Sequence, residues 1–215
     1  SFKFGVGDIK YKDLNGDGVI NNGDPNNKQH GVGTLENHGD LKVIGNELPD
    51  FEYGITLGLD YKGFDFSTYF QGVGSRDYWA YGNVAIPSGM SALDAIFTHQ
   101  TDYWTPQNTD AFYPRPTDHN WVSDGQNFKI QDRYLSDMSY LRCKNITLGY
   151  SLPKNLLKKI DFQKVRVYFS AENMFTWDNM HLPVDPETTS WKGAWAFGRS
   201  YPYMKTISFG VQAVF

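Results

Sequence analysis

The clearest pattern in the sequence is the alternation of apolar and polar residues over its last stretch, Met204 to Phe215. From Ile207 onward the odd-numbered positions are apolar, and the even-numbered positions up to Gln212 are small or polar. Successive side chains of a β-strand point to opposite faces, so this parity predicts a strand with one apolar side. That side must meet either a protein core or lipid.

Four earlier segments alternate in the same way. The first two are joined by Lys62-Gly63, which predicts a tight hairpin. No run of eighteen apolar residues exists, so a membrane-spanning helix is excluded, but strands of about 9–11 residues can span a bilayer with half of their side chains polar. The four predicted strands are Glu52–Tyr61, Gly63–Gln71, Tyr140–Tyr150 and Lys164–Asn173.

The connections between these strands alternate in length. The hairpin turn and the connection 151–163, with a predicted helical turn at Asn155–Lys159, are short, whereas 72–139 and 174–203 are long and aromatic. Short turns at one end and long loops at the other are typical of outer-membrane barrels, with the long loops outside the cell. Since about eight strands are needed to close a barrel, five require partner strands from elsewhere. Within the first long loop, a capping box at Ser91–Asp94 predicts a short helix through Phe97.

Composition narrows the function classes. The 215 residues carry a net charge of −4 and no dense Lys/Arg cluster, which argues against a nucleic-acid partner. The single Cys143 excludes an internal disulfide. Aromatic residues make up 16% of the chain although only 40% is hydrophobic, a mixture that transmembrane barrels share. Ser1 follows no recognisable leader, so we expect a processed chain or a fragment.

One loop has the residue types of a calcium site. Oxygen-bearing side chains stand at its first, third, fifth and twelfth positions, with Gly18 at the sixth for the sharp turn and a backbone carbonyl at the seventh. The alternative is an Asx-rich turn without metal, because no amphipathic helices flank it. The predicted ligands for Ca²⁺, or Mg²⁺, are Asp13, Asn15, Asp17, Val19 and Asp24.

The long loops are rich in aromatic side chains that could stack on sugars or hold a peptide. The alternative is that they pack the loops together or anchor the membrane interface. The histidines lack the spacing of a zinc site, and the sequence has no motif for a catalytic nucleophile or for nucleotide binding. The aspartates are scattered over the loops, where we expect water to solvate them. We therefore predict no catalytic residues and no redox or organic cofactor. The candidate ligand-binding residues are Trp79, Tyr81, Trp104, Trp121, Trp191 and Trp195.

Seven ordered blocks of the chain form a recognisable series: Gly7–Gly18, Ile44–Gly54, Phe70–Gly74, Trp104–Pro114, Tyr140–Tyr150, Leu152-Pro153 and Ala171–Trp177. Together they resemble the C-terminal end of SusC/RagA-type TonB-dependent outer-membrane transporters. The resemblance implies an all-β fold: the C-terminal antiparallel strands of a transmembrane barrel of about 22 strands, with long extracellular loops and a plugged lumen. It implies an extracellular loop with the EF-hand-like turn over 1–51, barrel strands and loops over 52–215, and a plug domain outside this chain.

The resemblance also implies a mechanism and partners. Such transporters import oligosaccharides or peptides together with a SusD-like surface lipoprotein that covers the barrel, using energy relayed by TonB. Here TonB would act through the N-terminal part of the transporter that this chain does not contain, and the chain would supply barrel wall and loops in a Gram-negative, Bacteroidetes-type outer membrane.

Two other classes fit parts of the pattern. A soluble, calcium-stabilised β-sandwich that binds carbohydrate would share the aromatics and the alternation, and it predicts a second sheet over the apolar side chains. A secreted glycan-cleaving enzyme would need two carboxylates within about 5–10 Å of each other in a cleft.

Overall fold

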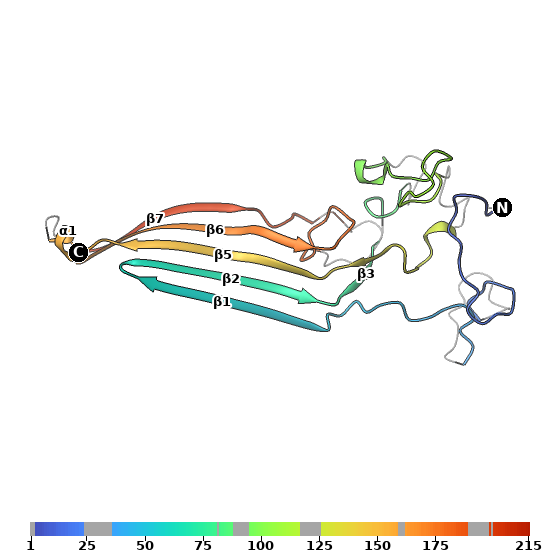
Figure 1. Ribbon diagram of the computed structural model, residues 1–215, viewed down its shortest axis with the longest axis horizontal. Helices are drawn as coiled ribbons and strands as arrows, with labels where there is room; N and C mark the ends of the chain where they lie inside the picture. Colours follow the sequence, from blue (N-terminus) through green and yellow to red (C-terminus); the bar gives the residue numbers. More distant parts are fainter. Residues whose placement is uncertain are drawn as a thin grey trace. The chain divides into compact units, whose positions relative to one another are not determined.

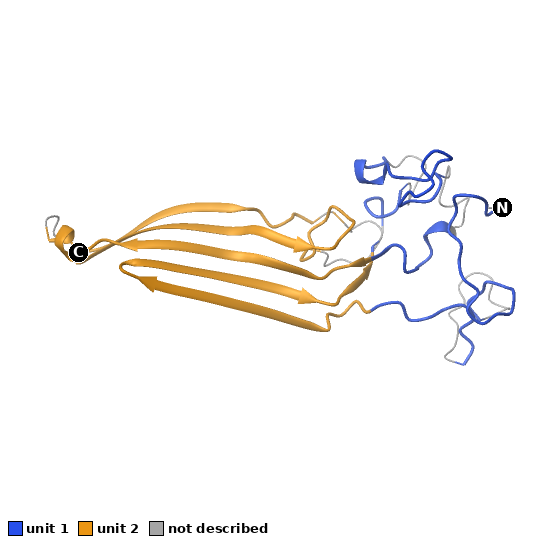
Figure 2. Ribbon diagram, viewed as in Figure 1, with its two compact units in different colours: residues 1–45, 80–135, 193–195 blue, residues 46–79, 136–192, 196–215 orange. Residues whose placement is uncertain are grey.

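The computed structural model describes residues 3–23, 36–80, 82–87, 95–116, 126–158, 162–188, 198 and 200–215. The chain divides into two units, coloured separately in Figure 2. Unit 1 comprises Ser1–Gly45, Ala80–Leu135 and Gly193–Trp195, and unit 2 comprises Asn46–Trp79, Ser136–Lys192 and Ala196–Phe215. The predicted division into a loop over 1–51 and strands with loops over 52–215 stays a prediction.

Unit 2 is built on one antiparallel sheet of five strands in the order β1-β2-β5-β6-β7 (Figure 1). All five predicted strands are confirmed. β2 and β6 run three and five residues further at their C-terminal ends than the alternation indicated, because Gly74 pairs with Phe51 and Trp177 pairs with Leu141. The strands are β1 (Phe51–Tyr61), β2 (Phe64–Gly74), β5 (Tyr140–Ser151), β6 (Lys164–Asp178) and β7 (Thr206–Val214).

The short connections have the predicted form. Lys62 and Gly63 have φ angles of 47° and 89°, the positive pair that a two-residue hairpin turn of type I′ requires. The helical turn between β5 and β6 is α1 (Lys154–Leu157), which starts directly after Pro153. No helix among the described residues is long and apolar enough to cross a membrane.

Four small elements interrupt the long connection between β2 and β5. They are β3 (Asp77–Trp79) and β4 (Leu135–Asp137), which pair with each other, and the 3₁₀ turns η1 (Thr98–Gln100) and η2 (Gln126–Phe128). Three-residue strands are too short to show alternation, so the sequence did not predict them. Most of the predicted helix from Ser91 lies outside the described residues.

The register divides the five-stranded sheet into two faces, which we call the apolar face and the polar face. Neighbouring strands align residues of the same character, so each face is continuous across all five strands. One row of the apolar face is Leu57, Thr68, Ile146, Ala171 and Ile207, and the next row, on the polar face, is Gly58, Ser67, Thr147, Ser170 and Ser208.

Large side chains of the apolar face are exposed rather than packed. Leu57 is 53% exposed and Phe209 is 81% exposed. Within the described residues, therefore, no second sheet seals this face as a β-sandwich would.

The one polar side chain in that apolar row is explained by an irregularity in the sheet. The register shifts at Tyr69/Phe70 in β2 and at Cys143/Asn145 in β5. The Thr68 hydroxyl donates to the Asn145 carbonyl oxygen at 2.9 Å. A backbone acceptor beside the shift is therefore satisfied from within the sheet, as burial or lipid exposure requires.

On the polar face, an ion pair crosses over a strand. Arg166 of β6 donates from Nε to Oδ1 of Asp65 in β2 at 2.8 Å, and its Nη2 contacts the second carboxylate oxygen. The strand between them, β5, carries Gly149 at this point. A Cβ there would lie 2.5 Å from Arg166 Nε and 2.5 Å from Asp65 Oδ1, so the pair could keep this position only with glycine beneath it.

We expect Gly149→Ala to lower the free energy of unfolding by up to about 1 kcal/mol, because its Cβ would displace the ends of two flexible, partly exposed side chains and so weaken their ion pair. Gly58→Ala is the matched control, since a Cβ at this polar-face glycine would meet only the Phe66 carbonyl oxygen, at 4.0 Å. Guanidinium titration of the full-length protein measures both. Equal midpoints for the two variants would show that the close approach at Gly149 does not matter.

Candidate functional site

The most densely charged site of unit 2 is centred on Arg142 of β5. Its side chain is 3% exposed and lies on the polar face, where Arg142 pairs with Thr176 of β6. Its Nη1 donates to Glu187 Oε2 at 2.6 Å, its Nη2 contacts Asp185 Oδ2 at 2.8 Å, and its Nε donates to Thr176 Oγ1 at 2.9 Å. All three guanidinium nitrogens are therefore used, two of them by carboxylates that are 8% exposed.

Two more β5 side chains bind the same carboxylate. Lys144 Nζ donates to Glu187 Oε2 at 2.8 Å, and the Tyr140 hydroxyl donates to Glu187 Oε1 at 2.8 Å. Tyr203 covers the site: its ring centroid lies 4.1 Å from Lys144 Nζ and 5.1 Å from Arg142 Cζ. Two cations face two anions, so the group is neutral as a whole. We call Tyr140, Arg142, Lys144, Asp185, Glu187 and Tyr203 the Arg142 cluster.

The Arg142 cluster joins both limbs of the β6–β7 connection to β5. Asp185 Oδ1 accepts the Glu187 N–H at 2.9 Å on the outgoing limb, and Asp185 Oδ2 accepts the Tyr203 N–H at 3.3 Å on the returning limb. The sequence analysis missed this site. An arginine inside a predicted strand was its only signal, and the two carboxylates that bind it lie more than forty residues away.

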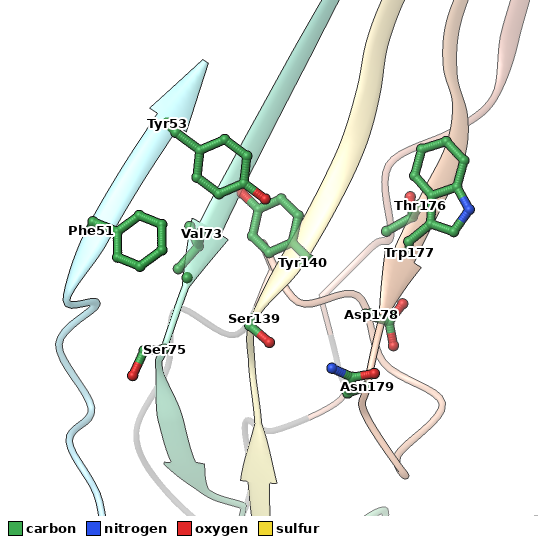
Figure 3. A pocket seen from close by; sticks show the side chains of 11 residues that line it. Phe51, Tyr53, Val73, Ser75, Ser139, Tyr140, Thr176, Trp177, Asp178 and Asn179 are labelled. Atoms are coloured by element: carbon green, nitrogen blue, oxygen red, sulfur yellow. The ribbon is translucent and has the colours of Figure 1, made fainter. Parts of the chain in front are cut away.

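A shallow, open hollow of about 840 Å³ lies at the ends of four strands of unit 2 (Figure 3). Aromatic side chains and hydroxyl or amide groups line it together, a combination that suits stacking and hydrogen bonding to a polar ligand. Its residues come from β1, β2, β5 and β6 and the positions next to them: Phe51, Tyr53, Val73, Gly74, Ser75, Ser139, Tyr140, Thr176, Trp177, Asp178 and Asn179.

The predicted calcium loop is a set of side-chain-to-backbone turns in unit 1. Both oxygens of Asp13 accept backbone N–H groups, from Gly16 at 2.6 Å and Gly18 at 2.8 Å. Asp17 Oδ1 accepts the Val19 N–H at 2.8 Å. Carboxylate and carbonyl oxygens are thus gathered in one loop, which is the donor chemistry that Ca²⁺ prefers.

The loop is closed by a residue that the sequence analysis did not single out. Asp40 accepts the Leu14 N–H at 2.6 Å and the Asn21 N–H at 2.8 Å, and these hydrogen bonds hold the pKa of Asp40 below its usual value. Asp24, the predicted twelfth-position ligand, lies outside the described residues. Across the described ranges, no three acidic, histidine or cysteine side chains converge on one point. The metal site stays a prediction.

Of the predicted ligand-binding aromatics, the structure describes two. Trp79 is 5% exposed, and the Trp104 ring packs against Gly7, where a Cβ would come within 2.5 Å of it. Both side chains pack within the protein, and their contact with a ligand stays a prediction. Tyr81, Trp121, Trp191 and Trp195 lie outside the described residues.

Other loop aromatics in unit 1 also pack together. Tyr113 stacks on Tyr134 with the ring centroids 5.8 Å apart, and Phe112 meets Tyr113 edge-on at 4.9 Å. Burial raises the pKa of Tyr113 to about 12. These rings form a small core for the loops. Exposed rings do occur in unit 2, where Phe175 and Trp177 stack at 5.9 Å.

A fully buried carboxylate ties together distant parts of unit 1. Asp8, whose side chain is 0% exposed, accepts two hydrogen bonds of 2.8 Å from Arg115 and one of 2.9 Å from Asn127. Burial opposes the charge of Asp8, but these hydrogen bonds and that of the Gly5 N–H outweigh it, so the pKa of Asp8 is lowered.

We expect Asp8→Asn to lower the free energy of local unfolding around Asp8 by about 1.5–3 kcal/mol at neutral pH. This is the usual contribution of hydrogen bonds to a charged group. A lowered pKa stabilises the folded state above the ordinary pKa of 3.8, and that stabilisation is lost as the pH falls through the folded-state value. The difference between parent and variant should therefore shrink below about pH 4.

Hydrogen exchange of residues 3–11 in the full-length protein, compared at matched pH, measures this effect. The exposed Asp110→Asn is the control and should leave the exchange unchanged. If the exchange rates of parent and Asp8→Asn still differed by the same amount at pH 3, the charge of Asp8 would not be the source of the stabilisation.

The chain was compared with known proteins. No family model matches it. It is 31% identical over 185 residues to TonB-dependent receptor P3 of Formosa agariphila, covering 82% of this chain and 17% of that protein. It is 28% identical over 225 residues to TonB-dependent receptor P26 of the same organism, covering 98% and 20%. With TonB-dependent receptor SusC of Bacteroides thetaiotaomicron it shares 28% identity over 182 residues, covering 84% and 17%.

Solved structures with a similar fold include those of RagAB. The RagAB peptide importer in its open-open state matches with a TM-score of 0.60 and 24% identity, over 81% of this chain and 18% of that chain. The RagAB peptide transporter matches with a TM-score of 0.55 and 23% identity, over 78% and 17%. At this identity the likeness shows the shared fold.

The chain spans 17–20% of the length of these three curated relatives. Their match runs over most of this chain, and the five-stranded antiparallel sheet agrees with the fold of RagAB. This chain is therefore a homologue of part of the TonB-dependent receptors, SusC among them, with a fold similar to that of RagAB.

Proposed function

We propose that this chain forms wall and extracellular loops of an outer-membrane barrel that imports nutrients with energy from TonB. The single observation that carries the proposal is the apolar face, which runs unbroken across five strands and leaves large side chains exposed. Exposed apolar surface of this extent marks an interaction site, and for a sheet with a polar opposite face a bilayer fits best.

The dimensions of the apolar face suit a bilayer. From Tyr53 to Tyr61, β1 extends about 26 Å at about 3.3 Å per residue. With the strand tilt of about 40° that is usual in such barrels, this corresponds to about 20 Å along the membrane normal, close to the apolar band of about 25 Å.

Aromatic rings gather near both ends of the apolar face. Near the long connections, Phe51 and Tyr53 lie 5.9 Å apart, and near the short turns Phe64 and Tyr150 lie 4.5 Å apart. Rings at both ends of an apolar band correspond to the aromatic girdles of membrane barrels. This pattern supports a role for these side chains at the two interfaces with lipid headgroups.

The polar face then lines the barrel lumen, and the long connections 75–139 and 179–205 belong to the extracellular end of the barrel. The remaining strands and the plug come from the rest of the transporter, and TonB acts through its N-terminal part. A SusD-like surface lipoprotein is the proposed partner over the loops, in a Gram-negative, Bacteroidetes-type outer membrane. No catalytic role is proposed.

Oligosaccharides and peptides are the proposed cargo classes. One relative is SusC, and the structural neighbour RagAB is named a peptide importer. Tyr53 and Trp177, which line the hollow of Figure 3, belong to one row of the apolar face, so in this proposal they lie at the lipid interface and not against cargo. The four loop aromatics outside the described residues, Tyr81, Trp121, Trp191 and Trp195, are proposed to contact the cargo.

The experiment is electrophoresis of the full-length protein from isolated outer membranes. A barrel should require detergent for extraction and should migrate anomalously in SDS until boiled. A protein that is released by salt wash, stays monodisperse in plain buffer and migrates identically before and after boiling would contradict the proposal.

We also propose that the loop beginning at Asp13 binds Ca²⁺, or Mg²⁺, and stiffens the segment. The gathered oxygens of Asp13 and Asp17 support this, with Asn15, the Val19 carbonyl and Asp24 completing the donor set. The bound ion would supply structural cross-linking and no chemistry.

We expect Asp13→Asn with Asp17→Asn to weaken Ca²⁺ binding at least about tenfold from an affinity of about 10⁻⁴–10⁻³ M, the range of extracellular modules. Isothermal titration of the full-length protein with CaCl₂ measures this, with Asp102→Asn as the control carboxylate from another loop. Heat of binding that is absent in the parent, or equal in parent and variant, would identify the loop as a metal-free turn.

A further inference from the structure

We propose that the two described limbs of the β6–β7 connection form a strap, folded over the lumenal side of the barrel wall and held there by the Arg142 cluster. The strap is defined as residues 179–188 and 200–205. The inference rests on the proposed function, because the polar face is lumenal only if the apolar face meets lipid.

The first step is the direction of Arg142. It shares its parity with Gln71 and Thr176, its partners in the register, and with Tyr140 two positions earlier. All of these belong to the polar face. The atoms that bind Arg142 from the strap must therefore lie on that face of the sheet, which is the lumenal one.

The second step is the path of the strap. It leaves β6 at Asp178 and enters β7 at Thr206, yet its carboxylates bind β5, the neighbour of β6 on the side away from β7. A connection that ran straight outward between β6 and β7 would not reach Arg142. The strap therefore folds back across β6, and both of its limbs are attached at Asp185.

The third step is the strength of the attachment. Asp185 and Glu187 are nearly buried, so releasing the strap would separate two ion pairs of Arg142 and one of Lys144. Hydrogen bonds between charged groups are among the strongest in proteins, and three ion pairs would have to separate together, so the released state is rarely populated. The strap is consequently a fixed constriction at the outer mouth of the lumen and limits the size of what enters.

The test uses thiol labelling of the full-length protein in intact cells. A single reporter is introduced by Ser200→Cys, an exposed position of the returning limb, in a Cys143→Ser background. A small, charged thiol reagent should react, whereas a maleimide carrying a 5-kDa polymer, about the size of a small protein, should be excluded from the lumen. Adding Asp185→Asn and Glu187→Gln should raise the rate of polymer labelling about tenfold or more, since charge-assisted hydrogen bonds are lost.

The matched control is Asp65→Asn, which breaks an ion pair on the same face without touching the strap. It should leave polymer labelling unchanged. Should the double variant lose the heat-modifiable band, Glu187→Gln alone keeps the Asp185–Arg142 pair and should still raise labelling about threefold.

Polymer labelling that is equal in parent and variants, whether fast or slow, would overturn the strap. Failure of the proposed function looks different, because the protein would then be neither heat-modifiable nor labelled by the small reagent from outside intact cells.

Discussion

Replacing Arg142 by alanine is expected to lower the free energy of unfolding by about 3–5 kcal/mol, the loss typical of removing one partner from a buried ion pair. Asp185 and Glu187 would stay in an environment that leaves them 8% exposed, with Lys144 as the remaining cation of the cluster. The Thr176 hydroxyl would lose its donor as well. Guanidinium titration of the full-length protein, followed by loss of the heat-modifiable band, measures the change.

Arg166→Ala is the matched control for this prediction. Arg166 lies on the same polar face and also pairs with a carboxylate, but its side chain is 20% exposed and that of Asp65 is 30% exposed. Solvent screens such a pair, so its loss should cost about 1 kcal/mol or less. Equal losses for the two variants would mean that the burial of the Arg142 cluster contributes nothing.

The second large effect is expected from Leu57→Arg. Leu57 is central in β1 and is 53% exposed on the apolar face, where it pairs with Thr68. If that face meets lipid, an arginine near the bilayer midplane should destabilise the barrel by about 2–4 kcal/mol. The measurement is the amount of heat-modifiable protein in the outer membrane, together with its guanidinium midpoint.

Ser67→Arg provides the comparison, because Ser67 belongs to the adjacent row on the polar face. In a lumen the arginine would be solvated, and the barrel should assemble normally. A sheet that tolerates both arginines equally would have water on both faces, and the membrane assignment would fail.

The five long strands could be predicted because alternation is a local property of the chain. Each strand is set by the parity of its own residues, as in Ile207, Phe209 and Val211, whatever it pairs with. The ends of β2 and β6 could not be predicted, since pairing of Gly74 with Phe51 and of Trp177 with Leu141 extends them beyond the alternating residues.

The charged site was beyond the reach of sequence patterns for a related reason. Arg142 and Glu187 are separated by 45 positions, and only folding of the β6–β7 connection brings them together. Asp40 is a similar case, 26 positions from Leu14, whose backbone N–H it accepts. By contrast, the contacts of Asp13 with Gly16 and Gly18 are local, and the loop motif predicted that turn correctly.

The sequence by itself determined which residues form strands, which faces of those strands are apolar, and at which end the long connections lie. These features follow from side-chain parity and turn chemistry, which act over a few residues. Tertiary structure alone decided the register that aligns five apolar stripes into one face, the passage of the Asp65–Arg166 pair over Gly149, and the attachment of the strap to Arg142. Each of these depends on contacts between residues far apart in the chain, which no local pattern encodes.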